Sequence, residues 1–263
     1  MVRIVWLNLR NIRLIARLDI KAPNLVKGIQ FEGLRKLGDP QAYALNYYNE
    51  GIDEIYYLDI VASLYERNSL TDIIKEATRD VFVPVTVGGG LRSCEDVINV
   101  LRAGADKVSI NTAAIKNPTV ITDVARRFGS QCMVLSIEAK KKMNRWEAYY
   151  DNGREPSGLD VVEWAMKGES LGAGEIILTS IDQEGTVNGF DNELVHAVTS
   201  NVDIPVVASG GMGKLSHLES VVKKGNADAI AMAHVLHYGK LKIKDIRQFC
   251  KSNGVPVRRL YEI

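Results

Sequence analysis

The feature that most constrains the fold of this chain is an internal repeat. The segment Pro84–Gly90 (Pro-Val-Thr-Val-Gly-Gly-Gly) recurs 121 residues later as Pro205–Gly211 (Pro-Val-Val-Ala-Ser-Gly-Gly). Gly51–Ile60 recurs at the same spacing as Gly172–Ile181, and two further segment pairs agree with this spacing to within two residues. Self-similarity at a fixed period indicates a duplicated structural unit. We therefore predict two halves, near residues 13–128 and 132–252.

Within each half, short runs rich in β-branched residues alternate with helical patterns. The predicted strands are 13–19, 54–60, 84–88, 106–111, 132–138, 175–181, 205–209 and 228–233. The predicted helices are 39–50, 70–80, 93–103, 118–128, 159–171, 191–200, 215–225 and 242–252. This is the count of an α/β protein with a single closed (β/α)8 TIM barrel. A doubly wound open sheet is the rival, but four βα units taken twice close naturally into a ring.

Composition excludes several classes of partner. No Pro/Ser-rich linker divides the 263 residues, so we predict one domain over 1–263. The net charge of +1 provides no field that would attract nucleic acid or a membrane surface. No apolar run reaches the roughly 18 residues of a membrane span. The three cysteines form no CxxC motif, which suits a reducing cytosol and predicts a cytoplasmic protein.

Glycines follow two of the predicted strands and indicate anion binding. They are Gly88-Gly89-Gly90 after the third strand and Gly210-Gly211 after the seventh. Glycines at such a turn let backbone N–H groups converge on an anion. Two cradles in one chain favour a ligand with two phosphates. The alternative is that both are tight strand-to-helix turns that bind nothing.

Two carboxylates end strands on opposite sides of the predicted ring. Asp19 ends the first strand and Glu138 ends the fifth, and ligands bind this end of a TIM barrel. Facing carboxylates between two phosphate cradles predict acid/base chemistry. The alternative is that these carboxylates cap loops or pair with nearby lysines such as Lys21 and Lys140. His234 and His237 have no third ligand at metal-binding spacing, so we predict neither a metal nor another cofactor.

At these residues the chain resembles the cyclase subunit of imidazole glycerol phosphate synthase, from histidine biosynthesis. The resemblance covers nearly the whole chain after about residue 12. It is carried by Leu18-Asp-Ile-Lys21, Val87-Gly-Gly-Gly90, Ala105-Asp-Lys-Val-Ser-Ile-Asn-Thr112, Leu178-Thr-Ser-Ile-Asp182 and Ala208-Ser-Gly-Gly211. In that family a partner glutaminase releases ammonia, which travels through the barrel. The cyclase combines it with a bis-phosphorylated ribulosyl substrate.

The resemblance also assigns roles to individual residues. Asp19 and Glu138 match the catalytic aspartates, and Lys27 matches a loop lysine. With the cradle glycines included, the implied phosphate contacts are Gly89, Gly90, Asn111 and Thr112 on one side, and Gly185, Gly210, Gly211 and His234 on the other. Four charged residues match an ammonia gate at the lower mouth, namely Arg13, Glu54, Lys107 and Glu175. Their alternative role is a neutral ion-pair layer that closes the barrel floor. Asp106 matches a contact to the glutaminase.

The chain departs from the family at several of these positions. Glu138 and Glu184 stand where the family has aspartates, and His234 stands where it has a serine. A displacement of about 1 Å can cost roughly a hundredfold in such sites. The stretches Asp19–Asn24 and Asp59–Asn68 resemble a paralogous branch that serves a sugar amidotransferase in bacterial surface-polysaccharide synthesis.

Three hypotheses follow. The first is a subunit that relays ammonia from a glutaminase, its partner in a heterodimer, to a sugar amidotransferase. The second is a genuine cyclase, and the third is a non-catalytic scaffold or regulator of a glutaminase. A retained gate combined with an altered catalytic carboxylate favours the relay.

Overall fold

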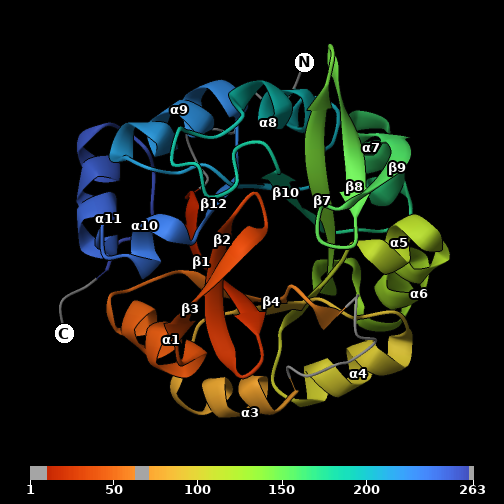
Figure 1. The fold of residues 1–263 in the computed structure, drawn as a ribbon, viewed down its shortest axis with the longest axis horizontal. Helices are drawn as coiled ribbons and strands as arrows, with labels where there is room; N and C mark the ends of the chain where they lie inside the picture. Colours follow the sequence, from red (N-terminus) through yellow and green to blue (C-terminus); the bar gives the residue numbers. More distant parts are fainter. Residues whose placement is uncertain (1–10, 63–70, 261–263) are drawn as a thin grey trace.

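The computed structural model describes residues 11–62 and 71–260, and its core is a closed barrel of eight parallel strands (Figure 1). The strands are β1 (Arg13–Lys21), β4 (Glu54–Asp59), β5 (Val85–Gly88), β6 (Lys107–Ile110), β7 (Met133–Lys142), β10 (Glu175–Ser180), β11 (Val206–Ser209) and β12 (Ala229–Met232). They follow one another around the ring in chain order, and pairing of β12 with β1 and of β7 with β10 completes it. The predicted (β/α)8 barrel is confirmed.

Helices surround the barrel and connect its strands. They are α1 (Pro40–Asn49), α3 (Thr71–Asp80), α4 (Cys94–Arg102), α5 (Thr112–Lys116), α6 (Thr119–Phe128), α7 (Val161–Ser170), α8 (Asn192–Thr199), α9 (Leu215–Gly225), α10 (His234–His237) and α11 (Ile243–Ser252), with a 3-10 turn η2 (Ser130–Cys132). The Asp39 carboxylate caps α1 by accepting a hydrogen bond from the Gln41 backbone N–H at 3.1 Å. Eight of these helices lie where the sequence predicts them. The short α5 and α10 were not predicted.

The two copies of each repeated segment lie on strands at opposite sides of the barrel. The ring order places β1 across from β7, β4 across from β10, β5 across from β11 and β6 across from β12. These are the strands that carry the repeated segments. Equivalent positions of the two halves therefore face each other across the barrel, as the two-half prediction requires.

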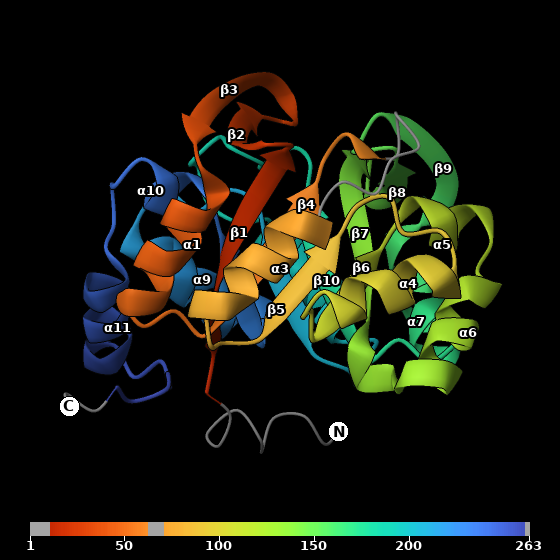
Figure 2. The ribbon, with the colours of Figure 1, turned by 90° about the horizontal axis from the view of Figure 1, so that it is seen from below.

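Two antiparallel hairpin extensions rise from the end of the barrel at which the strands finish (Figure 2). In one, β1 continues into β2 (Asn24–Ile29) and β3 (Glu32–Gly38). In the other, β7 continues into β8 (Arg145–Tyr150) and β9 (Glu155–Asp160). The sequence analysis did not predict the first hairpin, because β3 is mostly exposed and has no apolar alternation. Pairing with the end of β1 holds it in place.

The barrel has an outer and an inner apolar core. Leu14, Ala16 and Leu18 of β1 point outward into the core shared with the helices. The opposite face of the barrel strands supplies a smaller inner cluster, Ile15, Tyr56, Val134, Ile177, Val207, Ala229 and Ala231. Because side chains alternate along a strand, Arg13, Ile15, Arg17 and Asp19 all point inward at successive heights. In the described part of the chain no helix is long and apolar enough to span a membrane.

Candidate active site

The carboxylate of Asp19 is buried at the mouth of the barrel and held by two cations. Its Oδ1 accepts a hydrogen bond from Arg17 Nε at 2.8 Å, and its Oδ2 accepts one from Lys27 Nζ at 3.0 Å. Burial by itself would raise the pKa of Asp19, but Arg17 and Lys27 outweigh it and lower that pKa to about 2. Asp19 is therefore ionised at neutral pH. The alternative pairing with Lys21 is not what the structure shows.

Glu138, at the mouth on the opposite strand β7, has very different surroundings. Its Oε2 accepts a hydrogen bond from the Gly153 backbone N–H at 2.7 Å, in the turn between β8 and β9. Burial is the main influence on its pKa and raises it to about 7, against a smaller lowering effect of Arg17. Lys140 does not pair with Glu138 but lies over the Tyr149 ring, 5.7 Å from its centroid. Asp19 and Glu138 thus form a pair of carboxyl groups whose pKa values are driven apart.

Lys27 comes from the unpredicted β2–β3 hairpin and is buried beneath it. Besides Asp19, its ammonium contacts the carboxylate of Glu184, in the loop after β10. Burial would lower the pKa of Lys27, but Asp19 and Glu184 together raise it. The Gln30 backbone N–H donates to the Glu184 carbonyl at 2.8 Å, which fastens the hairpin to that loop. The hairpin therefore covers one side of the mouth.

The residues predicted for the first phosphate line a single cavity of about 160 Å³. They are Gly89, Gly90, Asn111 and Thr112, and Glu138 lies in the same wall. Arg92 and Lys116 add two cations that the sequence analysis did not name. The Asn111 Oδ1 atom is buried without a hydrogen-bond partner among the described residues. This cavity therefore offers cations and amide groups next to a carboxyl group of high pKa.

The residues predicted for the second phosphate also lie together, in a smaller cavity of about 20 Å³. They are Gly185, Gly210, Gly211 and His234, and the cavity is also lined by Lys27, Glu184 and Arg17. Burial lowers the pKa of His234, with help from Lys240 and Lys27. No group of His, Cys, Asp and Glu side chains within 11–62 and 71–260 is placed to hold a metal.

The cradle glycines are also required by the packing of the backbone. Gly89 and Gly211 have φ values of 95° and 104°, which favour glycine. A Cβ at Gly89 would collide with the Asp59 carbonyl, and one at Gly211 would collide with the Gly189 carbonyl. Tight turns alone thus account for the choice of glycine at these two positions. The cations and polar groups that share the cavities are what favours anion binding.

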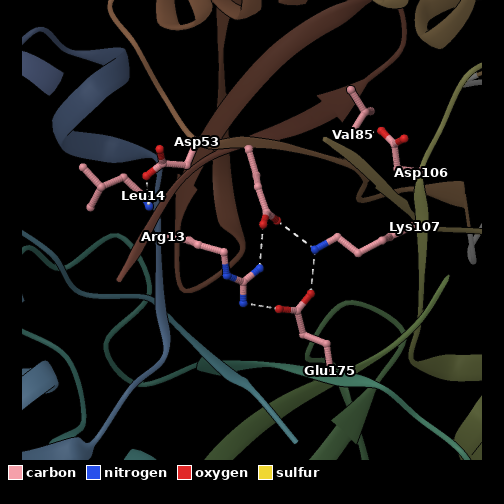
Figure 3. A network of polar contacts seen from close by, with 8 residues as sticks. Arg13, Leu14, Asp53, Val85, Asp106, Lys107 and Glu175 are labelled. Carbon is pink, nitrogen blue, oxygen red and sulfur yellow. Dashed lines mark hydrogen bonds and ion pairs between the residues drawn. The ribbon is translucent and has the colours of Figure 1, made fainter. Parts of the chain in front are cut away.

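The four predicted gate residues form a closed ring of alternating charges at the opposite end of the barrel (Figure 3). Arg13 pairs with Glu54 at 2.6 Å and also with Glu175, while Lys107 lies 2.8 Å from each of the two carboxylates. Burial would lower the pKa of Arg13, but Glu175 and Glu54 hold it above its ordinary value. Each carboxylate therefore binds both cations, which suits either a gate or a structural floor.

Asp106, which is predicted to contact a glutaminase, makes two hydrogen bonds within the chain, between the starts of β5 and β6. Its Oδ2 accepts a hydrogen bond from the Val85 backbone N–H at 2.8 Å, and its own N–H donates to the Val85 carbonyl. Figure 3 shows the two residues beside the charged ring. Asp53 makes the same two hydrogen bonds with the backbone of Leu14, and we call this arrangement an aspartate clasp. Asp228, the repeat equivalent of Asp106, clasps Val206. Asp106 is exposed at this end of the barrel, so it is available to a partner as well.

Arg17 is the residue at the mouth that the sequence analysis missed. It lies between Ile15 and Asp19 on the inward face of β1, and its side chain is 2% exposed. A barrel strand is buried on both faces, so an arginine in its interior is unusual and needs a partner. An arginine at this position of a predicted buried strand is the feature of the sequence that could have identified Arg17 as a functional residue. The contacts of Arg17, with residues more than 160 positions away, become visible only in the fold.

Comparison with known proteins agrees with this architecture. A family model described as "Histidine biosynthesis protein" matches residues 13–242. The imidazole glycerol phosphate synthase subunit HisF of Legionella pneumophila is 66% identical over 206 residues, which cover 78% of this chain and 97% of that protein. The corresponding HisF subunits of two Dehalococcoides mccartyi strains are 48% identical over 248 residues, covering 94% of this chain and 98% of each relative.

The fold and the mouth thus define a (β/α)8-barrel protein with two facing carboxyl groups and two glycine-lined cavities. The chain belongs to the HisF family of imidazole glycerol phosphate synthase subunits. The names of these relatives support the histidine-pathway alternative better than the surface-polysaccharide branch. Of the stretch that resembles that branch, residues 63–68 lie outside the described residues.

Proposed function

We propose that this chain is the cyclase subunit of an imidazole glycerol phosphate synthase. It would combine ammonia with a bis-phosphorylated ribulosyl substrate bound across the mouth of the barrel. The observation that carries the proposal is the pair Asp19 and Glu138, which face each other with pKa values of about 2 and about 7. Groups whose surroundings separate their pKa values in this way are suited to opposite acid/base roles.

The two carboxyl groups would divide the chemistry between them. Addition of ammonia to a carbonyl carbon places negative charge on the carbonyl oxygen and positive charge on the nitrogen. Glu138, half protonated near pH 7, would donate a proton to the oxygen, because a pKa near the working pH suits general acid/base catalysis. Asp19 stays ionised and would stabilise the positive nitrogen. Lys27 and Arg17 hold Asp19 in place.

In this proposal ammonia would reach the mouth through the interior of the barrel. Above the charged ring lies the inner apolar cluster that contains Ile15, Ile177 and Val207, and above it lies the mouth. A neutral ammonia molecule crosses an apolar layer at far lower cost than ammonium, because burying a charge is expensive. We include in the proposal a glutaminase partner at the ring end of the barrel, with Asp106 as one of its contacts.

The test is turnover of purified protein with ammonium and the bis-phosphorylated ribulosyl substrate. We expect wild-type turnover of about 1 s⁻¹ or more, on the usual scale of enzymes. Asp19→Asn and Glu138→Gln should each lower it by roughly a hundredfold or more, because electrostatic stabilisation by a positioned group and general acid catalysis each contribute on that order. The control is Glu147→Gln, which removes a carboxylate from the same β7–β8 hairpin but outside both cavities.

The second candidate is relay of ammonia to a sugar amidotransferase. One observation favours it: Glu138 is a methylene longer than the aspartate that the family uses here. Under this alternative, wild-type turnover with the ribulosyl substrate is negligible, and Glu138→Asp raises it from a low base. Turnover below about 10⁻³ s⁻¹ in the presence of saturating ammonium would therefore reject the cyclase proposal.

A further inference from the structure

The guanidinium group of Arg17 is held on two of its three nitrogens and left open on the third. Nε donates to Asp19 at 2.8 Å, while Nη1 donates to Thr179 Oγ1 at 3.2 Å and to Ser209 Oγ at 3.0 Å. Nη2 is buried and has no hydrogen-bond partner among the described residues. Contacts to β1, β10 and β11 thus fix the orientation of the group and leave one nitrogen available.

An open nitrogen on a buried guanidinium is costly and calls for an explanation. A buried polar group without a hydrogen-bond partner destabilises the folded protein, and a charged one does so more strongly. Arginine keeps its charge at every relevant pH, so Arg17 cannot avoid this cost by deprotonation. The Phe31 ring lies 5.5 Å from the guanidinium carbon and borders it on the hairpin side. A ligand oxygen is the partner that would remove the cost.

The surroundings of Arg17 select the kind of oxygen. Arg17 lines the second cavity together with Gly210, Gly211 and His234. The two carboxylates near Arg17, Asp19 and Glu184, both bind Lys27. Arg17 contacts them through Nε and Nη1, with Nη1 4.0 Å from Glu184 Oε2, so neither carboxylate is a hydrogen-bond partner of Nη2. Guanidinium groups bind phosphate oxygens with short, charge-assisted hydrogen bonds. The backbone N–H groups of glycines with positive φ suit the same anion.

We propose that Arg17 is a ligand-binding residue whose Nη2 donates a hydrogen bond to a phosphate held in the second cavity. The assignment rests on the proposed function in that a phosphorylated substrate supplies the anion. It adds a guanidinium group from inside the barrel to a cavity that is also lined by Lys27, His234 and the cradle glycines. It also makes this end of the site select a phosphate over a neutral polyol.

The test is a titration of the full chain with inorganic phosphate, followed by NMR at backbone amides. The amides of Gly210 and Gly211 report on the second cavity, and those of Gly89 and Gly90 report on the first as an internal control. We expect Arg17→Gln to raise the phosphate Kd at Gly210 and Gly211 by tenfold or more, with a change below about threefold at Gly89 and Gly90. Arg17→Lys keeps the positive charge but lacks the planar guanidinium group with its several N–H donors. Its phosphate Kd at Gly210 and Gly211 should therefore lie between those of the wild type and Arg17→Gln.

Three results would overturn the assignment: an unchanged Kd at Gly210 and Gly211, an equal loss at both cavities, or no phosphate binding at Gly210 and Gly211 in the wild type. A merely structural role for Arg17 predicts a lower Tm together with the first of these. If Arg17→Gln does not fold, the NMR signals of the Arg17 guanidinium group in the wild type test the assignment instead. They should shift on addition of phosphate and not on addition of glycerol, and the absence of a shift with phosphate would reject the proposal.

The titration involves no turnover, so it can fail or succeed independently of the proposed function. A wild-type protein that binds phosphate through Arg17 but lacks cyclase turnover would keep the Arg17 assignment and reject the cyclase. An active cyclase whose phosphate affinity does not depend on Arg17 would do the reverse.

Discussion

At the scale of single residues, the raised pKa of Glu138 makes the stability of the protein depend on pH. Its pKa is raised by burial from 4.5 to about 7, so the folded protein binds this proton more tightly than the unfolded chain does. The contribution of Glu138 to stability is therefore complete below about pH 4.5 and is lost as the pH rises to about 7. Asp19 behaves oppositely, since its lowered pKa gives stability that is lost only as the pH falls from about 4 toward 2.

We expect Glu138→Gln to become progressively more stable than the wild type between pH 4.5 and 7. Glutamine stays neutral and still accepts the Gly153 hydrogen bond, so it avoids the cost of a buried charge. The difference in the free energy of unfolding should grow by at most about 3.4 kcal/mol, at about 1.36 kcal/mol per pKa unit. Urea unfolding at pH 5, 6, 7 and 8 measures it.

Glu147→Gln is the matched control for this experiment. Hydrogen bonding to Lys142 lowers the pKa of Glu147, so this carboxyl group is ionised in both folded and unfolded states over pH 5–8. Its effect on stability should therefore be constant over that range. If the free energy of unfolding of Glu138→Gln also differed from that of the wild type by a constant amount over pH 5–8, this result would contradict the raised pKa of Glu138.

At the scale of secondary-structure elements, the charged ring ties the starts of β1, β4, β6 and β10 together. We expect Lys107→Met to destabilise the barrel by a few kcal/mol, because it leaves Glu54 and Glu175 sharing only Arg13. Chemical denaturation checks this, and Lys107→Arg should recover most of the loss. Both interpretations of the ring, as gate and as floor, make this prediction.

The gate interpretation makes an additional prediction for the complex with a glutaminase. Lys107→Met should alter the ratio of glutamine-driven to ammonium-driven turnover, because only glutamine-driven turnover uses the ring. Arg258→Met is the control, since Arg258 pairs with Asp53, outside the ring. An unchanged ratio in Lys107→Met would leave the ring as a structural floor.

The aspartate clasps give a second element-scale prediction. Asp106→Ala leaves the Val85 backbone N–H without its acceptor and should cost about 1–3 kcal/mol of stability. Asp106→Asn keeps an oxygen at that position and should stay close to wild type, yet it removes the charge offered to a partner. Calorimetry with the glutaminase then isolates the contact. Equal affinity for wild type and Asp106→Asn would remove Asp106 from the interface.

Asp228→Asn is the matched control for the clasp. Asp228 clasps Val206 as Asp106 clasps Val85, and it occupies the equivalent place in the other half of the chain. We expect the same small effect on stability and no effect on glutaminase binding. A weakened complex in both variants would indicate a general change at this end of the barrel.

At the scale of the whole molecule, the two cavities lie on different parts of the ring. The first is lined from β4 through β7 and the second mainly from β1, β11 and β12, with the loop after β10. A ligand that occupies both therefore connects the two repeated halves across the mouth. Ligand binding and barrel stability should be linked for this reason.

We expect inorganic phosphate to raise the free energy of unfolding of the whole chain. At a concentration of 100 Kd, each independent site adds about 2.7 kcal/mol. Thermal unfolding in phosphate, compared with chloride at equal ionic strength, measures the effect. Crystals soaked in phosphate should show both cradles occupied. Identical unfolding in the two salts would contradict phosphate binding at either cradle.

The amino-acid sequence by itself determined the barrel. Its repeat and its alternation of β-branched runs with helical patterns predicted all eight barrel strands and eight of the helices. It also placed Asp19, Glu138 and the cradle glycines correctly at one end, because in a parallel barrel every strand finishes at the same face. Local pattern and the fixed direction of the strands are sufficient for these conclusions.

Only the tertiary structure decided the electrostatics of the site. The separation of the Asp19 and Glu138 pKa values depends on burial and on Arg17 and Lys27. Lys27 reaches Asp19 from a hairpin that the sequence pattern did not reveal. Arg17 bonds to Thr179 and Ser209, 162 and 192 residues away. Local sequence carries no trace of such distant contacts, because they exist only once the barrel has closed.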